Sequence, residues 1–367
     1  MAHSAEPDAS GERFTIAGLP TPESQTLPDA MAPLIFNAWY VIAKRAEVDR
    51  SLRAIKSLGQ PLVYYRTEDG RPVVLDDRCA HRRFPLSKSK LIGDTIQCGY
   101  HGFTYDTTGR CVRAPGVNVQ PRFGIRSYPC AELGPWLWVW MGDPDKADSA
   151  AIPFIDPFEI APYGVTGYKL NPANYMLFIE NILDMSHAHF LHEAASIEFA
   201  LQPLQRFEVP GGVGFIQEMA SMAISFMATW CGGNPEQLVQ GRMTGRQLGP
   251  SFHFNLTENI PLPGDDQPVL PGKFCATHAI TPMDERNTHQ FFSVSIDKPL
   301  SIGEKQLLSI CEGVVFEQDV TALGAMQRAI DEDRRSGQVE YSINSDRFGM
   351  AMRRILRDRK AEESAGR

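Results

Sequence analysis

Two short cysteine and histidine motifs carry the strongest chemical signal in this sequence. Residues 79–81 read CAH and residues 98–101 read CGYH, so each motif offers one thiolate and one imidazole. Thiolate ligands suit iron–sulfur clusters and zinc, and imidazole suits both metals. The order Cys-His then Cys-His lets two cysteines hold one iron and two histidines hold the other, which indicates a Rieske [2Fe–2S] centre bound by Cys79, His81, Cys98 and His101. A structural zinc site is the alternative, although zinc sites usually arrange their ligands in another order.

The surroundings of these motifs favour the cluster. Both motifs are expected on loops between short β-strands, where hairpin tips can bring four ligands together. Gly99 and Gly102 flank the second motif and let backbone N–H groups approach the cluster sulfur atoms. Pro115 and Gly116 follow at a distance that suits a third, covering loop.

The strings 79-CAHRRFPLS-87 and 98-CGYHGFTYD-106 resemble the terminal oxygenase components of Rieske non-heme iron oxygenases. They are most similar to the branch that contains the vanillate and dicamba O-demethylases, and the resemblance covers about residues 33–345. It implies an oxidoreductase that acts on paired donors, incorporates oxygen from O₂, and carries a mononuclear Fe(II) beside the cluster. It also implies a homotrimer and a separate ferredoxin or NAD(P)H-dependent reductase. The chain itself has no Gly-rich dinucleotide motif.

The mononuclear iron is expected in the segment 180-ENILDMSHAHFLH-192. Non-heme Fe(II) of this type needs two histidines and one carboxylate on one face, with the opposite positions open. The candidate ligands are His187 and His192. On a helix with 100° per residue, His189 points about 200° away from His187, and His192 lies about 140° away. We therefore expect a π-bulge or a break near Phe190.

Two more residues of this segment are assigned to the site. Asp184 stands one turn before His187 on the same helix face and can accept a hydrogen bond from a ligand histidine. The resemblance implies that this aspartate links the mononuclear site to a Rieske histidine of a neighbouring subunit, here His101 of the partner subunit. It also implies a position beside the iron for Asn181, for which a structural cap or a core amide is the alternative.

The third ligand is sought in a helix near the end of the chain. Residues 316–327 read FEQDVTALGAMQ, in which Glu317 should face solvent. An apolar stripe at helical spacing includes Asp319, together with Val315, Ala322, Leu323 and Met326. A carboxylate buried without a partner is costly, and iron ligation supplies the partner. The resembling proteins carry their third ligand in a similar acidic string, so we assign Asp319, with a surface aspartate as the alternative.

The middle of the chain indicates an apolar pocket for a small aromatic or hydrophobic substrate. It is rich in phenylalanine and methionine, although most of these side chains are more simply explained as core: Phe215, Met219, Met222, Phe226, Met227, Phe252, Phe254, Phe291 and Phe292. The resemblance makes Asn255 and His278 candidate substrate contacts. We expect a monooxygenase that performs oxidative O- or N-demethylation or dealkylation. A ring-hydroxylating (cis-dihydroxylating) aromatic dioxygenase and a Rieske-type electron carrier without the second iron are the alternatives.

These sites require an α+β chain with two domains. We expect an N-terminal all-β Rieske [2Fe–2S] domain over 33–148 and a C-terminal catalytic domain, an antiparallel sheet with helices (helix-grip-like), over 149–350. Residues 1–32 and 351–367 are expected to be tails. Strands are expected at 62–65, 73–75, 95–97, 136–141, 164–170, 215–230, 251–257, 274–281 and 290–296. Helices are expected from about 172 and over 303–333.

Composition excludes several other classes of protein. A chain of 367 residues suits about two domains. The net charge of −8 argues against nucleic-acid binding. There is no apolar run that could span a membrane and no signal peptide, so we expect a cytoplasmic protein whose seven cysteines stay reduced.

Residues 78–126 hold nine Lys or Arg against two Asp, a local charge of +7 that suits either an acidic ferredoxin-type donor or a neighbouring subunit.

Overall fold

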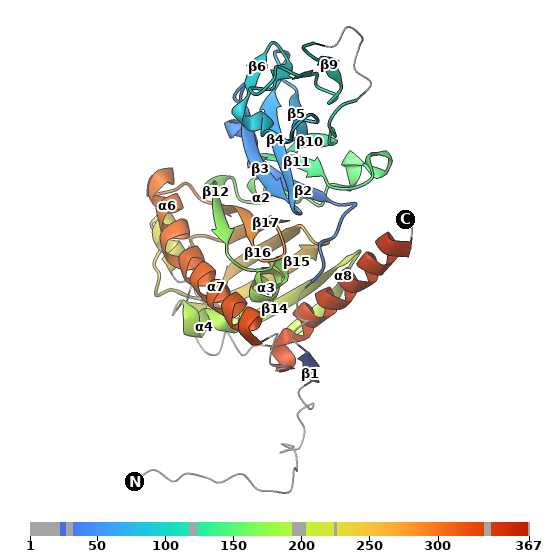
Figure 1. Ribbon diagram of the computed structural model, residues 1–367. Helices are drawn as coiled ribbons and strands as arrows, with labels where there is room; N and C mark the ends of the chain where they lie inside the picture. The colour runs from blue at the N-terminus through green and yellow to red at the C-terminus, as the bar shows by residue number, and fades with distance from the viewer. Residues whose placement is uncertain are drawn as a thin grey trace, which may run out of the picture.

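A computed structural model describes residues 23–26, 32–116, 123–192, 203–223, 226–333 and 339–365. Figure 1 shows two stacked parts, a small all-β part that contains β2 to β11 and a larger part in which one sheet is covered by helices. The α+β class expected from the sequence is confirmed. Most of the tail expected over 1–32 lies outside the described residues. The described part of that range includes strand β1 (Glu23–Thr26), which pairs with β19 (Val339–Ser342).

The N-terminal part consists of three small antiparallel sheets. Each hairpin is short because polar and glycine-rich turns interrupt the apolar runs, as in most small all-β domains. The first sheet is β10-β11-β2, formed by Cys130–Leu133, Trp136–Trp140 and Trp39–Lys44. The second is β3-β4-β5, formed by Arg53–Ser57, Gln60–Arg66 and Pro72–Asp76. The third is β6-β7-β8-β9, formed by Lys90–Ile92, Thr95–Gln97, Thr104–Tyr105 and Cys111–Arg113.

The C-terminal part is built on one seven-stranded antiparallel sheet. Its order is β12-β18-β17-β16-β15-β14-β13. The strands are β12 (Tyr163–Asn171), β13 (Leu204–Val209), β14 (Gly212–Ala223), β15 (Leu238–Leu248), β16 (Phe252–Pro261), β17 (Lys273–Pro282) and β18 (Thr288–Ile296). The expected strand over 215–230 ends earlier, because Phe226–Cys231 form a 3₁₀ turn.

Strands β13 and β15 were not expected from the sequence. In β15 the buried positions alternate as Val239, Gly241, Met243, Gly245 and Gln247, so two inward positions hold glycine, a residue with low strand propensity. Space explains these glycines. A Cβ at Gly245 would lie 2.2 Å from the ring of Phe215 on the neighbouring strand β14. The glycines therefore make room for bulky side chains of β14.

Helices cover one face of the sheet, as Figure 1 shows for α7 and α8. The longer helices are α3 (Tyr175–Leu183), α6 (Glu304–Ile310), α7 (Phe316–Asp333) and α8 (Arg347–Ala365), and the shorter ones are α2 (Pro157–Ile160) and α4 (His187–Leu191). A five-residue π-helical turn, Cys311–Val315, joins α6 to α7. The remaining 3₁₀ turns are Arg45–Glu47, Leu86–Lys88, Pro144–Lys146, Ser149–Ala151 and Asn344–Asp346. No described helix has both the length and the apolar content that a membrane crossing needs.

The C-terminal tail expected over 351–367 is wrong for most of its length. Residues up to Ala365 belong to α8, which packs on α3 and β14 through buried Phe348, Met352 and Leu356. Arg353 of this helix is 7% exposed and pairs with Glu180 of α3. The high charge of α8 hides its one apolar stripe, which becomes evident only against the helix that it covers.

The other face of the sheet carries the all-β part. Phe252 and Phe254 of β16 and Phe291 of β18 pack in one cluster with Trp136 and Trp138 of β11. Successive strand residues point to opposite faces, so the alternate residues of β16 point toward the helices. This alternation assigns one face of the sheet to the domain contact and leaves the other face for a site.

Candidate active site

The two cysteine and histidine motifs lie on two loops with the same backbone hydrogen bonds. The first loop connects β5 to β6 and the second connects β7 to β8, as expected. In each loop the cysteine N–H donates to the carbonyl five residues later, and the N–H four residues later donates to the cysteine carbonyl. The N–O distances are 2.9 Å for Cys79–Phe84, 2.7 Å for Cys98–Phe103, 2.9 Å for Arg83–Cys79 and 3.0 Å for Gly102–Cys98.

The fourth residue after each cysteine adopts a left-handed backbone conformation. The φ angle is 60° at Arg83 and 72° at Gly102. Glycine suits this conformation at the second loop, and a Cβ at Gly102 would also lie 3.3 Å from the ring of Pro115. Pro115 therefore packs over the second loop, as the covering loop requires.

The four side chains of these loops separate into two buried thiols and two exposed rings. Cys79 and Cys98 are buried and form no disulfide. The rings of His81 and His101 are exposed, with centroids 4.7 Å apart. This arrangement fits a [2Fe–2S] cluster with an inner, thiolate-bound iron and an outer, imidazole-bound iron.

Tyr105 completes this region and was not anticipated. Its hydroxyl lies 3.1 Å from Cys79 Sγ and accepts the Ala80 N–H at 3.0 Å, so its own proton is free for the sulfur. Burial raises the pKa of the Cys98 thiol, so an uncompensated thiolate there is unfavourable. Cluster iron would supply the compensation, and Tyr105 would donate to a cluster sulfur ligand.

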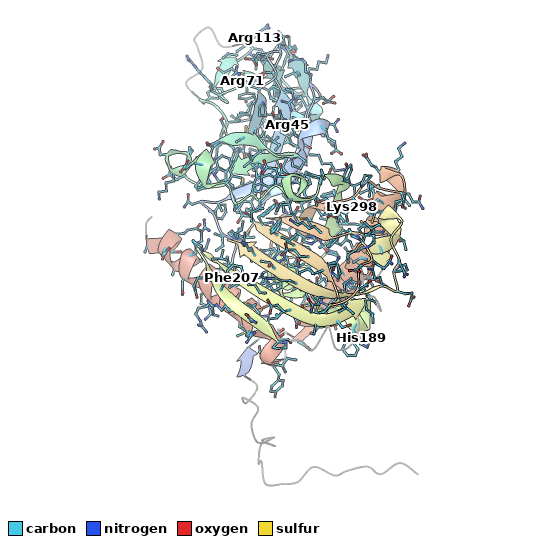
Figure 2. All side chains as sticks on the ribbon, turned by 180° about the vertical axis from the view of Figure 1, so that it is seen from behind. Arg45, Arg71, Arg113, His189, Phe207 and Lys298 are labelled. Carbon is cyan, nitrogen blue, oxygen red and sulfur yellow. The ribbon has the colours of Figure 1, made fainter. Side chains whose placement is uncertain are left out.

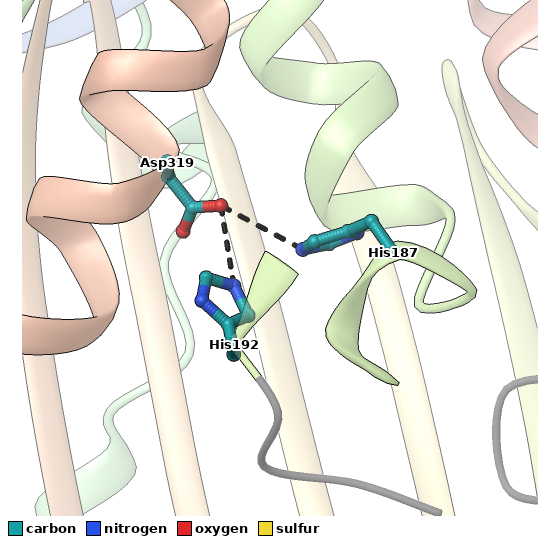
Figure 3. A group of neighbouring side chains, drawn as sticks. All are labelled: His187, His192 and Asp319. Atoms are coloured by element: carbon teal, nitrogen blue, oxygen red, sulfur yellow. Dashed lines mark ion pairs between the residues drawn. The ribbon is translucent and has the colours of Figure 1, made fainter. Parts of the chain in front are cut away.

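The second candidate centre brings together His187, His192 and Asp319 (Figure 3). One ligand atom from each residue lies within 4.8 Å of the others. Asp319 Oδ1 is 3.3 Å from His192 Nε2 and 3.6 Å from His187 Nε2. Two histidines and one carboxylate on one side of a site are the donor set of mononuclear non-heme iron.

The hydrogen bonds of the two rings indicate that a cation belongs there. His187 Nδ1 donates to the backbone carbonyl of Asp184 at 2.6 Å, and His192 Nδ1 donates to Gln318 Oε1 at 2.9 Å. Each ring then directs Nε2 toward the carboxylate of Asp319. Although burial opposes it, hydrogen bonding to Asp319 and Gln318 raises the pKa of His192, so this point attracts a positive charge, which Fe(II) would supply.

Asn181 lies directly beside these ligands, on α3. Its Nδ2 donates to Asp319 Oδ1 at 3.1 Å and lies 3.4 Å from His187 Nε2. The amide thus restrains the carboxylate, and it lines the adjacent cavity as well.

Two local details of this centre differ from the sequence expectations. Asp184 is the C-cap of α3 and does not share a helix with His187, because α4 begins only at His187. Its carboxylate accepts the Ser186 N–H at 2.9 Å, and its contact to His187 is made by the main-chain carbonyl instead. The carboxylate therefore stabilises the helix break that redirects His187.

The π-bulge or break expected near Phe190 is found as two separate features. Helix α4 ends at Leu191, so His192 follows it as the C-cap, with φ −100° and ψ −14°. The helix therefore ends one residue after Phe190, close to the expected break. The π-helical turn lies elsewhere in the chain, at Cys311–Val315, before Asp319. His189 is not in the group and lies at the edge of the molecule in Figure 2.

The buried stripe of α7 also differs from the expected one. Met326 is 46% exposed, whereas Asp319, Leu323, Gln327 and Ile330 are buried. The stripe runs along positions three or four residues apart, and Val315 belongs to the preceding π turn rather than to the helix. Glu317 is exposed as expected and pairs with Lys169 at 2.8 Å.

A cavity of about 410 Å³ adjoins the three candidate ligands. Its wall is mostly apolar, with Phe178, Ile182, Trp230 and Met243 among the lining residues. Asn255 and His278, the two candidate substrate contacts, also line it. A volume of this size accommodates a small aromatic molecule.

Of the nine phenylalanines and methionines singled out from the sequence, Met222 and Met227 line this cavity. Phe252, Phe254 and Phe291 are on the opposite face of the sheet, against the Rieske part. Phe215 and Met219 lie in the core with α3 and α8, Phe292 packs on Phe316, and the side chain of Phe226 lies outside the described residues.

Comparison with known proteins matches a family to each part of the chain. The family described as "Rieske [2Fe-2S] domain" matches residues 38–129. The family described as "Vanillate O-demethylase oxygenase C-terminal domain" matches residues 172–362.

Individual relatives extend over most of the chain. The dicamba O-demethylase oxygenase component of Stenotrophomonas maltophilia is 31% identical over 83% of this chain and 89% of its own length. The chloroacetanilide N-alkylformylase oxygenase component of Rhizorhabdus wittichii is 28% identical over 87% of this chain and 94% of its own length. The crystal structure of dicamba monooxygenase bound to dicamba matches 91% of this chain and 100% of that chain, with a TM-score of 0.79 and 27% identity.

Proposed function

Since this chain belongs to the Rieske non-heme iron oxygenases, in the group of the vanillate and dicamba O-demethylase oxygenase components, we propose that it oxidatively removes a small alkyl group from an aromatic or hydrophobic molecule. It is an oxidoreductase, the oxygenase component of a system in which a separate reductase or ferredoxin supplies electrons. It carries a [2Fe–2S] cluster and a mononuclear iron. The group removed is a methyl or other small alkyl on oxygen or nitrogen.

One observation carries this proposal. The three candidate ligands His187, His192 and Asp319 line a cavity of about 410 Å³, and the wall of this cavity is mostly apolar. Such a wall excludes water and holds the alkyl group of a small molecule beside the metal site. A Rieske electron carrier would need neither the ligands nor the cavity.

We assign the residues the following roles. Cys79, Cys98, His81 and His101 hold the cluster, and His187, His192 and Asp319 hold the mononuclear iron. When bound, the cluster supplies single electrons and the mononuclear iron supplies the place where O₂ is reduced. Asn181 restrains the Asp319 carboxylate, whereas Asn255 and His278 contact the substrate.

The overall reaction balances with two electrons from the donor. One oxygen atom of O₂ enters a C–H bond of the O-methyl or N-methyl group, and the other leaves as water with two protons. The resulting hemiacetal or carbinolamine then loses formaldehyde and leaves a phenol or an amine. The chain's contribution is to bind the substrate, orient its alkyl group and exclude water.

We also propose a homotrimer in which electrons pass between subunits. Arg113 of β9, near the Rieske loops, and His189 of α4 lie at opposite ends of the molecule in Figure 2. The cluster and the mononuclear site of one subunit are therefore far apart. Asp184 is partly exposed beside His187 and would meet His101 of the partner subunit.

The exposed surface around the Rieske loops supports a protein contact. Tyr100 is 60% exposed and Phe123 is 45% exposed, and the cations Arg82, Arg83 and Lys88 of the first Rieske loop are exposed too. This surface would receive either the neighbouring subunit or an acidic ferredoxin-type donor. High salt should slow electron delivery sharply if the donor docks there, and a rate that is independent of salt would assign the surface to the subunit contact.

None of the seven cysteines forms a disulfide, which supports a cytoplasmic location.

The reaction is tested with the holoenzyme, a surrogate ferredoxin and reductase, NADH, and a panel of methoxy- and N-alkyl-aromatics. Formaldehyde released in step with O₂ uptake is the expected result. O₂ uptake that yields ring-hydroxylated products and no formaldehyde would refute demethylation.

The electron path is tested by Asp184→Asn. The amide oxygen of asparagine still accepts the Ser186 N–H, so the helix break is kept and both metals should remain bound. Turnover should fall to background, because the charged link to the partner subunit is lost. Asp346→Asn is the matched control, since that carboxylate is a neighbour of Asp184 outside the path and its amide can still cap the Ile343 N–H. Full turnover by Asp184→Asn would remove the proposed path.

A further inference from the structure

A β-bulge in strand β14 directs Met222 into the cavity. Up to Met219, the alternate residues of β14 point to the helix-covered face of the sheet, where they are buried. The register then shifts, because Met219 pairs with Gly241 whereas Met222 pairs with Val239. The one extra residue moves the inward position from Ser221 to Met222, so Ser221 is exposed and Met222 lines the cavity.

Gly241 of β15 provides the space in which the Met222 side chain lies. A Cβ at Gly241 would overlap Met222 Sδ and would lie 2.8 Å from Met219 Cε. Gly241 is not among the glycines with a positive φ angle, so its backbone conformation is open to other residues. The thioether of Met222, rather than the backbone, therefore explains why glycine stands at this position.

Met222 is far along the sheet from the polar positions of the cavity. Its cross-strand partner Val239 stands six residues along β15 from Gly245, which is the partner of Asn255 on β16. At about 3.3 Å per residue, six residues correspond to roughly 20 Å along a strand. Because Met222 and Asn255 line the same cavity, this cavity extends along the strands, and Met222 belongs to its part remote from Asn255.

This remote part of the cavity is lined by methionine. Met222 packs on Ala228, the residue that follows Met227, and Met243 is the next inward residue of β15 after Gly241. Met222, Met227 and Met243 all line the cavity. The unbranched methionine side chain adapts to apolar groups of different shapes. A wall of this kind suits an alkyl group rather than a polar one.

We propose that Met222, directed by the bulge and seated on Gly241, limits the length of the substrate, and that the methionine-lined part of the cavity receives an apolar substituent remote from the alkyl group that is removed. Met222 is then a specificity-determining residue, and Gly241 is a positioning residue that acts through it. The inference rests on the proposed function for the location of the substrate, and it adds the substrate's length and its apolar substituent.

The test measures how affinity depends on the length of an alkyl substituent. The ligands are para-alkylanisoles whose alkyl chains run from methyl to hexyl, so that the methoxy group and the chain lie at opposite ends of the ring. Affinities for the oxidised holoenzyme are measured by calorimetry without a reductant, so no turnover occurs. We expect the wild-type affinity to rise about fourfold per added methylene up to one chain length and to stop rising beyond it.

Two substitutions should move this limit in opposite directions. Met222→Ala removes the thioether, so the limit should increase by about two carbons. Gly241→Ala displaces the thioether, and buried Met219 and Val239 leave the cavity as the side with space, so the limit should decrease by about one carbon.

A double variant shows whether Gly241 acts through Met222. Gly241→Ala combined with Met222→Ala should bind the series like Met222→Ala alone, because the added methyl group then has no thioether to displace. Gly245→Ala is the matched control, since Gly245 is on the same strand and its Cβ would meet the core residue Phe215 instead. The control should keep the wild-type limit, although it adds the same methyl group.

The outcomes separate this inference from the proposed function. Wild-type affinities that do not rise with the first added methylenes would refute the apolar substituent, and so would binding of no alkylanisole; neither result depends on the folding of a variant. An unchanged limit in Met222→Ala would refute the role of Met222. Equal effects of Gly241→Ala with and without the thioether would refute the role of Gly241. Formaldehyde release, measured separately, decides the reaction, so either conclusion can fail alone.

Discussion

Gln318 gives a sharp test of the proposed mononuclear site. Its Oε1 accepts the Nδ1 proton of His192 at 2.9 Å, which directs Nε2 of that ring toward Asp319. Gln318→Leu removes the acceptor and keeps a side chain of similar length. The change leaves the three proposed ligands in place, so it tests orientation rather than ligation.

The expected magnitude follows from the burial of His192. Its side chain is only 7% exposed, so water replaces the lost acceptor poorly. While Nε2 binds iron, Nδ1 must carry the proton, and the unpaired buried N–H costs about 1–3 kcal/mol. A difference of about 1.4 kcal/mol is a factor of ten, so Fe(II) should bind roughly 5- to 150-fold more weakly. This agrees with the 10- to 100-fold typical of groups that orient metal ligands.

The assay is an anaerobic Fe(II) titration against a competing chelator, on protein whose cluster content is measured by visible absorbance. The cluster spectrum should not change, because Gln318 is far from the Rieske loops. Glu317→Gln is the control, since the exposed neighbour pairs with Lys169 and should leave iron affinity unchanged. An unchanged Fe(II) affinity in Gln318→Leu would refute the assignment of His192 as an iron ligand held through Nδ1.

Three further predictions concern stability. Gly245→Ala should lower the free energy of unfolding by about 1–3 kcal/mol in urea titrations, because its Cβ would meet the buried ring of Phe215. Arg353→Met should cost about 1–3 kcal/mol, because the partly buried Glu180 carboxylate loses its cation. Exposed Arg354→Met should cost little, and equal losses would contradict the role of α8. Burial lowers the pKa of His253 to about 3, so between about pH 6.5 and pH 3 the unfolded state binds a proton that the folded state does not. The free energy of unfolding should therefore decrease as the pH is lowered through this window, and it should decrease less steeply in His253→Leu than in the wild type.

Local motifs explain how much of the site was predictable. Cys79 and His81 share one tight loop. His187 begins one short helix and His192 directly follows it, so the spacing of these residues in sequence already constrains their spacing in space. The hydrogen bond of Tyr105 to Cys79 crosses between strands and loops, and no spacing pattern announces it. The same holds for Gln318, which approaches His192 from a distant helix.

Secondary structure was predictable where the apolar pattern was regular, and it failed where packing replaced pattern. Strand β15 was missed because glycine stands at inward positions that neighbouring rings fill. Helix α8 was missed because its charge conceals a single apolar stripe. The π turn lies in Cys311–Val315 rather than beside Phe190. For β15 and α8 the deciding contacts join segments far apart in the chain.

The sequence by itself determined the two-domain α+β organisation and the residue types of both candidate metal centres. Short loops and helix spacing control these features, and both are local. The tertiary structure decided which face of the sheet holds the cavity. Alternation along β16 shows that Phe254 and Asn255 point to opposite sides, but only the packing of Trp138 and its neighbours against Phe252 leaves the face of Asn255 for the cavity. Burial and charge at that face depend on everything packed around it, which is why they could not be obtained from the order of residues alone.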